Sequence, residues 1–179
     1  MKRFLFLIVI GLTLGGCKKD DPGPAPPTAD PEFPASTKFA ATLYAPTTSV
    51  ANGATFEIRF VLYNVSEAFG AAAEITYSSD KATIDSSIVG SAFGPSDQII
   101  SLRGPVNTTT YAYGVTYKAG SGRSLTGSGV VVKLKCRAIA AGVATFTITP
   151  AKLNIKKSDG TPISNFGTIL IEPVTVVVN

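Results

Sequence analysis

The feature that most constrains the fold is a strict alternation of side-chain character in residues 55–63, TFEIRFVLY. One set of alternating positions is entirely apolar (Phe56, Ile58, Phe60, Leu62), and the other is mixed (Glu57, Arg59, Val61, Tyr63). Successive side chains of a β-strand point to opposite faces, so this pattern predicts a strand with one face in a hydrophobic core. We find no helical periodicity downstream of it. An antiparallel sheet with one buried face, and hence a β-sandwich or barrel, is expected.

Similar segments recur between residues 38 and 179, separated by turn residues such as Asn52-Gly53 and Gly120-Ser121-Gly122. Strands are expected at residues 38–44, 55–63, 70–77, 82–84, 98–103, 109–118, 129–138, 143–149, 152–156 and 167–178. A single domain of this size buries roughly 70% of its extended surface and needs no disulfide.

Residues 1–16 have the organisation of a secretory signal peptide. Lys2 and Arg3 precede an apolar run at residues 4–14, which is shorter than the about 20 residues that a membrane-spanning helix needs. The following Leu14-Gly15-Gly16-Cys17 resembles the bacterial lipobox, whose cysteine is acylated and becomes the mature N-terminus. We therefore expect lipidation at Cys17; the alternative is an ordinary signal peptide with an incidental cysteine.

The residues after Cys17 suggest an export signal followed by a spacer. Lys18, Lys19, Asp20 and Asp21 resemble a signal that sends lipoproteins to the outer face of the outer membrane; a solvated charge cluster is the alternative. The proline-rich remainder cannot bury enough apolar surface to fold. Residues 17–37 are thus predicted to be a disordered tether, and the expected location is the outer membrane, facing the exterior.

The second cysteine and the missing residue types argue against catalysis. Cys136 alternates with Lys133, Lys135 and Arg137, on the face predicted for Val130, Val132 and Leu134, which is typical of a buried thiol. The chain has no histidine, which excludes Ser-His-Asp and Cys-His arrangements and imidazole metal sites. We expect no enzymatic activity, no cofactor and no metal site.

The charge of the chain does not indicate nucleic-acid binding. Removing residues 1–16 lowers the formal net charge from +4 to +2, because Lys2 and Arg3 are lost. No basic cluster with interleaved aromatic residues remains. The membrane is expected as a partner only through the lipid.

The order of the segments resembles a cohesin domain, the nine-stranded jelly-roll module that binds dockerins. The segments that carry the resemblance are VANGATFEIRFVLYNV (50–65), GAAAEITYSSDKATI (70–84), residues 108–148 and KLNIKKSDGTPISNFGTILI (152–171). The resemblance implies an all-β sandwich over residues 38–179 that binds a dockerin-like protein through the sheet containing strands three, five, six and eight. Where the best-known cohesins carry an asparagine and an aspartate on strand three, this chain has Gly70 and Ala72.

The expected binding face consists of the outward residues of those strands, namely Ala72, Glu74, Thr76, Arg103, Thr116 and Lys118. A second hypothesis concerns Tyr111, Tyr113 and Tyr117, which share one face of a strand. If that face points inward, the rings are core; if it points outward, they form a strip on which sugar rings could stack. The core is favoured, since Val115 lies on the same face. A polysaccharide-binding module and a structural or adhesive surface protein remain the alternative functions.

Overall fold

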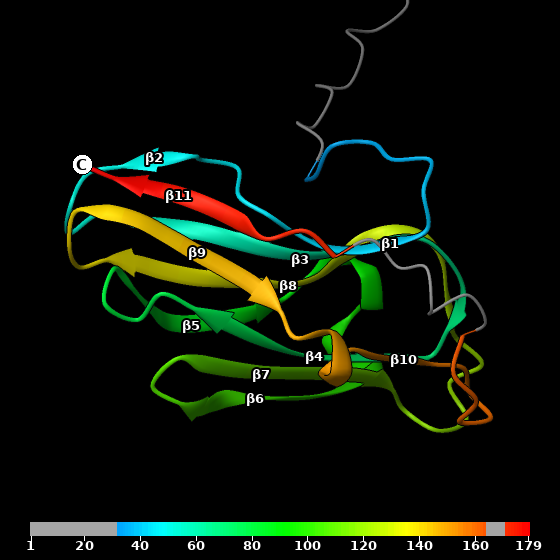
Figure 1. Cartoon of the computed structure of the whole chain (residues 1–179). Coiled ribbons are helices and arrows are strands. Elements are labelled where there is room, and N and C mark those ends of the chain that lie inside the picture. Colours follow the sequence, from blue (N-terminus) through cyan, green and yellow to red (C-terminus); the bar gives the residue numbers. More distant parts are fainter. Residues whose placement is uncertain (1–31, 164–170) are drawn as a thin grey trace, which may run out of the picture. The chain divides into compact units, whose positions relative to one another are not determined.

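The computed structural model describes residues 32–163 and 171–179, which form a sandwich of two β-sheets (Figure 1). Sheet A has the order β1-β3-β8-β5, with β1 at Ala40–Tyr44, β3 at Thr55–Ala68, β8 at Leu125–Ala138 and β5 at Ala82–Val89. Sheet B has the order β2-β11-β9-β4-β7-β6, with β10 also paired to β4. Its strands are β2 (Ser49–Val50), β11 (Val174–Val178), β9 (Gly142–Ile148), β4 (Gly70–Tyr77), β7 (Thr110–Tyr117), β6 (Ile99–Asn107) and β10 (Asn154–Lys156).

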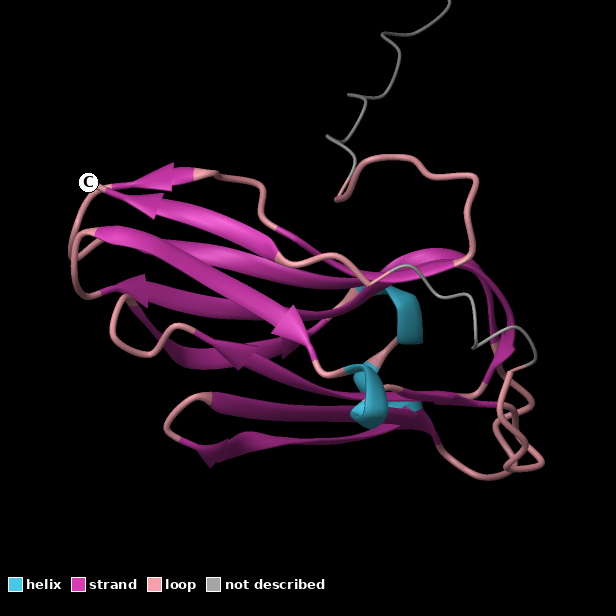
Figure 2. Cartoon of the chain, viewed as in Figure 1, coloured by secondary structure: helices cyan, strands magenta, loops and turns pink. Residues whose placement is uncertain are grey.

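The sandwich class predicted from the alternation is confirmed. In Figure 2 most of the described chain is β-strand. Loops connect the strands, together with three short 3₁₀ turns at Ser91–Phe93, Ser96–Gln98 and Pro150–Lys152. The described residues contain two strands beyond the nine that the resemblance implies, namely β2 and β10, and both are short. The pair β2–β11 is parallel, whereas the other strand pairs are antiparallel.

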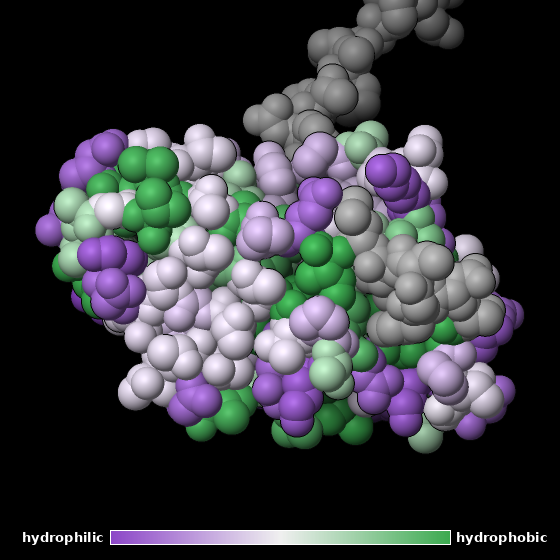
Figure 3. Space-filling view, in the orientation of Figure 1, coloured by the Kyte–Doolittle hydropathy of each residue, from purple (hydrophilic) through white to green (hydrophobic). Residues whose placement is uncertain are grey.

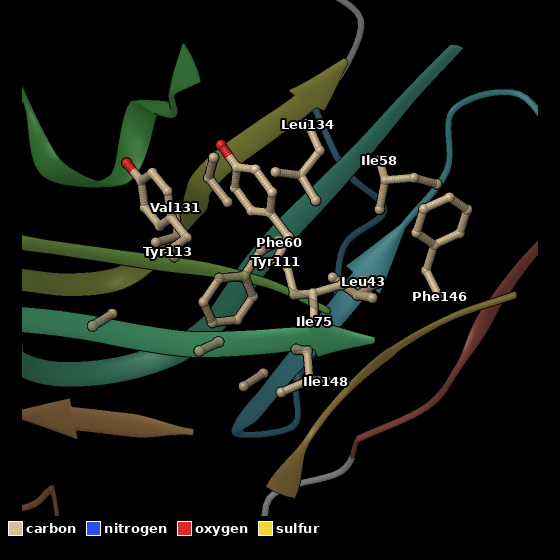
Figure 4. Packing of buried hydrophobic residues seen from close by; sticks show 14 of the residues in the cluster. Leu43, Ile58, Phe60, Ile75, Tyr111, Tyr113, Val131, Leu134, Phe146 and Ile148 are labelled. Atoms are coloured by element: carbon tan, nitrogen blue, oxygen red, sulfur yellow. The ribbon is translucent and has the colours of Figure 1, made fainter. Parts of the chain in front are cut away.

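The core lies between the sheets and is formed by the apolar set of each alternating strand. Ile58, Phe60 and Leu62 of β3 are fully buried, and so are Ile75 of β4 and Ile148 of β9. Figure 4 shows several of these side chains converging between the two layers. Burying one such side chain contributes about 1.5–3 kcal/mol, so the alternation itself selects which face of each strand is internal.

The longest strand pair contains irregularities that the alternation does not reveal. β3 and β8 change register between Phe60 and Val61, where Val131 of β8 is the extra residue. The expected placement of Val130 on the core face is therefore wrong: Val131 joins the main core, and Val130 packs on the outer side of sheet A. Because a bulge moves the following side chains to the opposite face, it breaks the period-two rule locally.

β3 also continues beyond the predicted end at Tyr63, through two further register shifts. Asn64 and Glu67 adopt positive φ angles of 52° and 56° there, a conformation that non-glycine residues seldom adopt. The irregular segment is held in place by the hydroxyl of Ser128, which accepts a hydrogen bond from the Asn64 backbone N–H at 3.0 Å.

Residues 32–38 lie against the outer face of sheet A, and we call them the strap. Phe33 meets Tyr63 edge-to-face, with ring centroids 5.4 Å apart, over the outer cluster of Ala40, Val61, Tyr63 and Val130. The Asn64 side-chain amide donates to the carbonyls of Ser36 and Lys38, both at 2.9 Å. The expected disorder of residues 17–37 is thus wrong for residues 32–37, because Phe33 finds an apolar surface to cover. Residues 17–31 lie outside the described part.

Charged groups fasten the start of the strap. The Glu32 carboxylate accepts hydrogen bonds from the Lys133 ammonium and the Ser91 hydroxyl, and its backbone carbonyl accepts one from Arg59. The Lys133 contact, followed by that of Ser91, lowers the pKa of the Glu32 carboxyl below its usual value of 4.5. Lys133, which the sequence places in a basic row with Lys135 and Arg137, is therefore paired with an acidic group of the strap.

We predict that Phe33→Ala lowers the free energy of unfolding by about 1–2 kcal/mol, because the variant loses the edge-to-face contact and uncovers the outer cluster. Urea denaturation measures the change, and limited proteolysis should cut the variant sooner within residues 32–38. Pro34→Ala, at an exposed position of the same strap, is the control and should change stability by less than about 0.5 kcal/mol. Equal effects of the two variants would contradict a structural role for Phe33.

A second prediction concerns pH. Since folding lowers the pKa of Glu32, its carboxylate contributes stability that is present above about pH 4.5 and is lost as the pH falls through the folded-state pKa. The side chain is partly exposed, so Glu32→Gln should cost at most about 1 kcal/mol at pH 7. Denaturation curves of both proteins across pH should converge below pH 4.5. A gap that persists at low pH would show that charge is not its origin.

Candidate functional site

The candidate site is the outer face of sheet B where β4, β7 and β6 lie side by side. The strand register brings the outward residues into three rows across these strands. The rows are Gly70–Thr116–Ile100, Ala72–Gly114–Leu102 and Glu74–Ala112–Gly104. Seven of these nine positions carry glycine, alanine, threonine or an acidic group rather than a large apolar side chain, so the centre of the face is shallow and smooth.

Apolar side chains rise along one border of this face. On β6, Ile100, Leu102 and Val106 are exposed, Leu102 by 76%. In the space-filling view, hydrophobic residues gather along the lower edge of the molecule, where β6 lies in Figure 1 (Figure 3). Exposed apolar residues that cluster in this way mark interaction surfaces more often than isolated ones do.

Polar side chains form the opposite border. β10 pairs with β4 at Gly70–Ala72, which places Asn154 and Lys156 on the outer face beside Ala72 and Gly70. Between the two borders lies a groove of about 480 Å³, lined mainly by β4, β7, Ile100 and Leu102 on one side and Asn154 and Lys156 on the other. A second hollow continues past Ala72 and Gly114 to Glu74 and Lys152.

Two of the three lysines along the polar border have acidic neighbours. The Lys152 ammonium lies 3.7 Å from the Glu74 carboxylate, and the Lys157 ammonium lies 2.6 Å from that of Glu67. The Glu67 contact raises the pKa of Lys157. Lys156 forms no ion pair with the part of the chain that the structure describes. Of the three border lysines, Lys156 is therefore the one whose ammonium has no acidic neighbour among the described residues.

Four of the six residues expected on the binding face lie on it. Ala72, Glu74 and Thr76 are successive outward residues of β4, and Thr116 stands opposite Gly70 on β7. The Thr76 hydroxyl donates to the Thr147 carbonyl at 3.3 Å, and that of Thr116 is turned toward backbone carbonyls of Phe69 and Tyr117. Because both hydroxyls are directed to backbone carbonyls, the methyl groups are the main parts of these two side chains that remain for contact with a partner surface.

The expectation for Arg103 is corrected by the register of β6. Arg103 pairs with Tyr113, whose side chain is internal, so it alternates with the outward Leu102. Its guanidinium donates to the Ser87 carbonyl of β5 at 2.5 Å and thereby links the two sheets at their open edge. Lys118 lies just beyond β7, at the end of the face, and its ammonium donates to the Asp97 carbonyl at 2.6 Å.

The possible sugar-stacking strip is not exposed. Tyr111, Tyr113 and Tyr117 are all part of the buried core, and Tyr113 is 2% exposed. Figure 4 shows Tyr111 and Tyr113 among the core side chains. The Tyr111 hydroxyl pairs with the Ser87 hydroxyl at 2.9 Å, and the Tyr117 ring packs on Phe93 at 5.3 Å. The preferred core interpretation is confirmed, and the stacking interpretation is wrong because Val115 and the three rings form the apolar set of β7.

Burial also governs the chemistry of two internal titratable groups, Tyr113 and Cys136. It raises the pKa of the Tyr113 hydroxyl to about 12, and that hydroxyl has no hydrogen-bond partner among the described residues. Cys136 is fully buried, as predicted, and burial raises the pKa of its thiol, which leaves it protonated and unreactive. No group of three acidic, cysteine or histidine residues in the described part could hold a metal ion.

Several residues of the face were not expected from the sequence. Ile100, Leu102, Gly114 and Lys156 line the groove, and Gly104 lines the second hollow. Of these, only Ile100 and Leu102 could have been expected, because the β6 alternation indicates an exposed apolar row. The N-terminal predictions at Cys17, Lys18, Lys19, Asp20 and Asp21 fall outside the described residues. Within the described part, no helix is long and apolar enough to cross a membrane.

The fold of this domain is similar to that of solved cohesin structures. The third cohesin of ScaC from Acetivibrio cellulolyticus, solved in complex with the ScaB dockerin, is 14% identical, with a TM-score of 0.63 over 77% of this chain and 98% of that one. A cohesin module of a Clostridium perfringens family 33 glycoside hydrolase is 12% identical, with a TM-score of 0.62 over 79% and 98%. A non-cellulosomal cohesin from the archaeon Archaeoglobus fulgidus is 12% identical, with a TM-score of 0.61 over 78% and 91%.

No protein-family model and no curated protein sequence matches the chain. The structural similarities nevertheless extend over nearly all of each cohesin module. The domain therefore has a cohesin-like jelly-roll fold, as the segment order predicted.

Two of the internal tyrosines, Tyr111 and Tyr113, should respond differently to loss of their hydroxyls. Tyr113→Phe removes a buried polar atom without a partner and should leave stability unchanged or raise it by up to about 1 kcal/mol. Tyr111→Phe leaves the buried Ser87 hydroxyl without its partner and should cost about 1–2 kcal/mol. Thermal denaturation of the two variants checks this contrast. Destabilisation by Tyr113→Phe would show that its hydroxyl has a partner in solution.

Proposed function

We propose that this chain is a lipid-anchored surface protein whose cohesin-like domain binds a protein partner of the dockerin kind through the outer face of sheet B. The binding is noncovalent and involves no catalysis. The observation that carries the proposal is the groove on that face, with an exposed apolar border at Ile100 and Leu102, in a fold shared with cohesins.

The character of the face supports recognition of a protein. A smooth centre excludes water when a complementary surface covers it, and the apolar border supplies buried area, while the polar border at Lys152, Asn154 and Lys156 can set specificity. Polysaccharide binding has less support, because Tyr111, Tyr113 and Tyr117 are internal and offer no stacking surface.

The structural neighbours support a partner of the dockerin kind. Several of the similar cohesins were solved in complex with dockerins, among them one from Acetivibrio cellulolyticus scaffoldin B with the Cel5 dockerin. At Gly70 and Ala72 this chain offers no polar side chain, so its recognition depends more on apolar contact and shape. We therefore propose a partner with a contact surface more apolar than that of the best-known dockerins.

The anchor and the strap suit presentation of this face. Lipid attachment at Cys17 and export through Lys18, Lys19, Asp20 and Asp21 would hold the protein on the exterior of the outer membrane. The chain joins the domain on the outer face of sheet A, where Phe33 and Glu32 are fastened. The outer face of sheet B is on the opposite side of the sandwich from the strap.

The proposal is tested with residues 17–179 carrying Cys17→Ser, used to capture secreted proteins of the source organism. We expect a dockerin-bearing protein, whose purified dockerin then binds in solution. Leu102→Glu should weaken that binding at least about thirtyfold, which corresponds to about 2 kcal/mol for a central apolar contact. It should leave the melting temperature unchanged, since Leu102 is exposed.

Lys135→Glu, which lies on the outer face of sheet A, is the matched control and should bind normally. Retention on an insoluble polysaccharide without any protein partner, or equal binding by Leu102→Glu, would contradict the proposal. Metabolic labelling with a fatty acid tests the anchor separately, because Cys17→Ser should abolish incorporation of the label.

A further inference from the structure

The strap at residues 32–38 is attached to the domain without strand pairing. None of its residues belongs to a β-ladder, and Glu32 and Phe33 at its start are half-buried. Pro34 and Ala35, which follow, are exposed and form no hydrogen bond with the described residues. Glu32 and Phe33 are therefore joined to the rest of the domain through a short exposed link.

The surface beneath Glu32 is a binding site for a carboxylate. Arg59 of β3 and Lys133 of β8 are direct cross-strand partners, and like charges in this position repel each other. Glu57 pairs with Arg59, whereas Lys133 has no ion pair with a described residue other than Glu32. The Ser91 hydroxyl also donates to the Glu32 carboxylate, and Arg59 donates to the Glu32 carbonyl. Three separate parts of the chain thus supply donors to one acidic residue.

An apolar surface for one aromatic ring lies beside this carboxylate site. The Phe33 ring meets Tyr63 edge-to-face and packs on the outer cluster of sheet A. We use the name clamp for the three donors and this cluster together, namely Arg59, Ser91, Lys133, Ala40, Val61, Tyr63 and Val130. The clamp suits a glutamate that is followed directly by an aromatic residue.

The contacts that hold the start of the strap are individually weak. The ion pair is partly exposed, by 25% at the Lys133 side chain and 34% at that of Glu32, and such pairs contribute little. One aromatic contact and a few hydrogen bonds must offset the entropy that is lost when residues 32 and 33 become ordered. A segment with so few buried contacts opens locally far more often than the domain unfolds. Each opening leaves Lys133 without an anion and the outer cluster without its cover.

The strap of a second copy has the chemistry that an open clamp requires. Glu32-Phe33 is the one place in the sequence where an acidic residue directly precedes an aromatic one. In a reciprocal exchange each clamp is filled again by the same two side chains, so neither copy loses a contact. Attachment of many copies to one membrane raises their effective concentration, although the exchange itself does not require the lipid.

We propose that the clamp on the outer face of sheet A takes Glu32 and Phe33 from a second copy of this chain, so that two copies associate by exchanging the starts of their straps. The hydrogen bonds from the Asn64 amide to the carbonyls of Ser36 and Lys38 stay in place. The link at residues 34 and 35 is therefore the hinge, and the two sheets A face each other across a twofold axis. The outer faces of sheet B then point away from each other, and the inference does not depend on what binds them.

The first test asks whether the clamp accepts the segment from a separate molecule. The recipient is residues 17–179 with Cys17→Ser, Glu32→Ala and Phe33→Ala, whose own strap cannot fill the clamp. The probe is the synthetic peptide DPEFPASTK, which has the sequence of residues 30–38. Titration followed by NMR should show saturable shifts of the Tyr63 and Lys133 signals. The parent with Cys17→Ser alone should bind the peptide at least about tenfold more weakly, because its own strap competes.

Variants of the peptide and of the recipient locate the binding. Peptides with Glu32→Gln or Phe33→Ala should bind at least about fivefold more weakly. Lys133→Glu in the recipient should abolish binding. Lys135→Glu, on the same face of β8 but without a hydrogen bond or ion pair to the strap, is the matched control and should leave binding unchanged. Absence of binding by DPEFPASTK, or equal binding by the Phe33→Ala peptide, overturns the clamp.

The second test detects exchange between complete straps and uses a chain whose clamp is intact. One copy carries the photoreactive p-benzoylphenylalanine in place of Phe33, and a second copy with a different tag has the natural strap. Both are residues 17–179, attached to vesicles by reaction of Cys17 with a maleimide lipid, because the buried Cys136 is unreactive. Irradiation should join the two copies, with the cross-link at Tyr63 or Val130 of the tagged copy.

The same variants serve as controls in this test. Lys133→Glu in the tagged copy should lower the yield of joined copies at least about fivefold, and Lys135→Glu should not change it. Cross-links confined to single chains at every surface density overturn the exchange, even where the peptide binds. The capture experiment tests the outer face of sheet B separately, so failure of the strap exchange and failure of the proposed function are distinguishable.

Discussion

The structure depends on the burial of one apolar set of side chains between two sheets. β3 and β8 form the long central pair of sheet A, and Ile58, Phe60, Leu134 and Cys136 point from them into the shared core. The opposing side chains come from sheet B, notably Ile75, Tyr113, Phe146 and Ile148 (Figure 4). Because the backbone alternates, each inward residue also sets the position of an outward neighbour. The layout of both outer surfaces thus follows from the packing of the interior.

The two outer surfaces of the sandwich differ in whether the chain itself covers their apolar residues. On sheet A, Val61, Tyr63 and Val130 form an apolar cluster, and the strap covers it with Phe33 while Glu32 pairs with Lys133. On sheet B, the described residues leave the apolar row of Ile100 and Leu102 uncovered beside the glycine and alanine residues at the centre of the face. One face is therefore completed within the chain, and the other is suited to a partner. This asymmetry is the reason why we propose the outer face of sheet B as the binding side.

Much of the fold could be predicted from residue order, since alternation reports burial directly. β4 begins and ends at the predicted residues, and the inward orientation of Tyr111 and Tyr113 follows from Val115 on the same face. The errors have two different origins. Val130 lies on the outer side of sheet A because of a bulge, and Arg103 lies on the inner side of β6 because it pairs with the internal Tyr113 of β7. Of the residues expected on the binding face, those on the regular strand β4 do point outward, whereas the positions of Gly104 and Gly114 beside them follow only from the strand pairing.

By itself, the sequence determined the sandwich class, the core residues of the regular strands, the burial of Cys136 and the absence of histidine-dependent chemistry. These properties depend on residue types and on periodicity, which are local. Tertiary structure alone decided that residues 32–37 belong to the domain, that Arg103 links the sheets, and that Ala72, Gly104, Ala112 and Gly114 lie side by side on the outer face of sheet B. These residues lie on different strands, and only hydrogen-bonded register brings them side by side. A surface assembled across strands is therefore a property of the fold that no single segment of the chain contains.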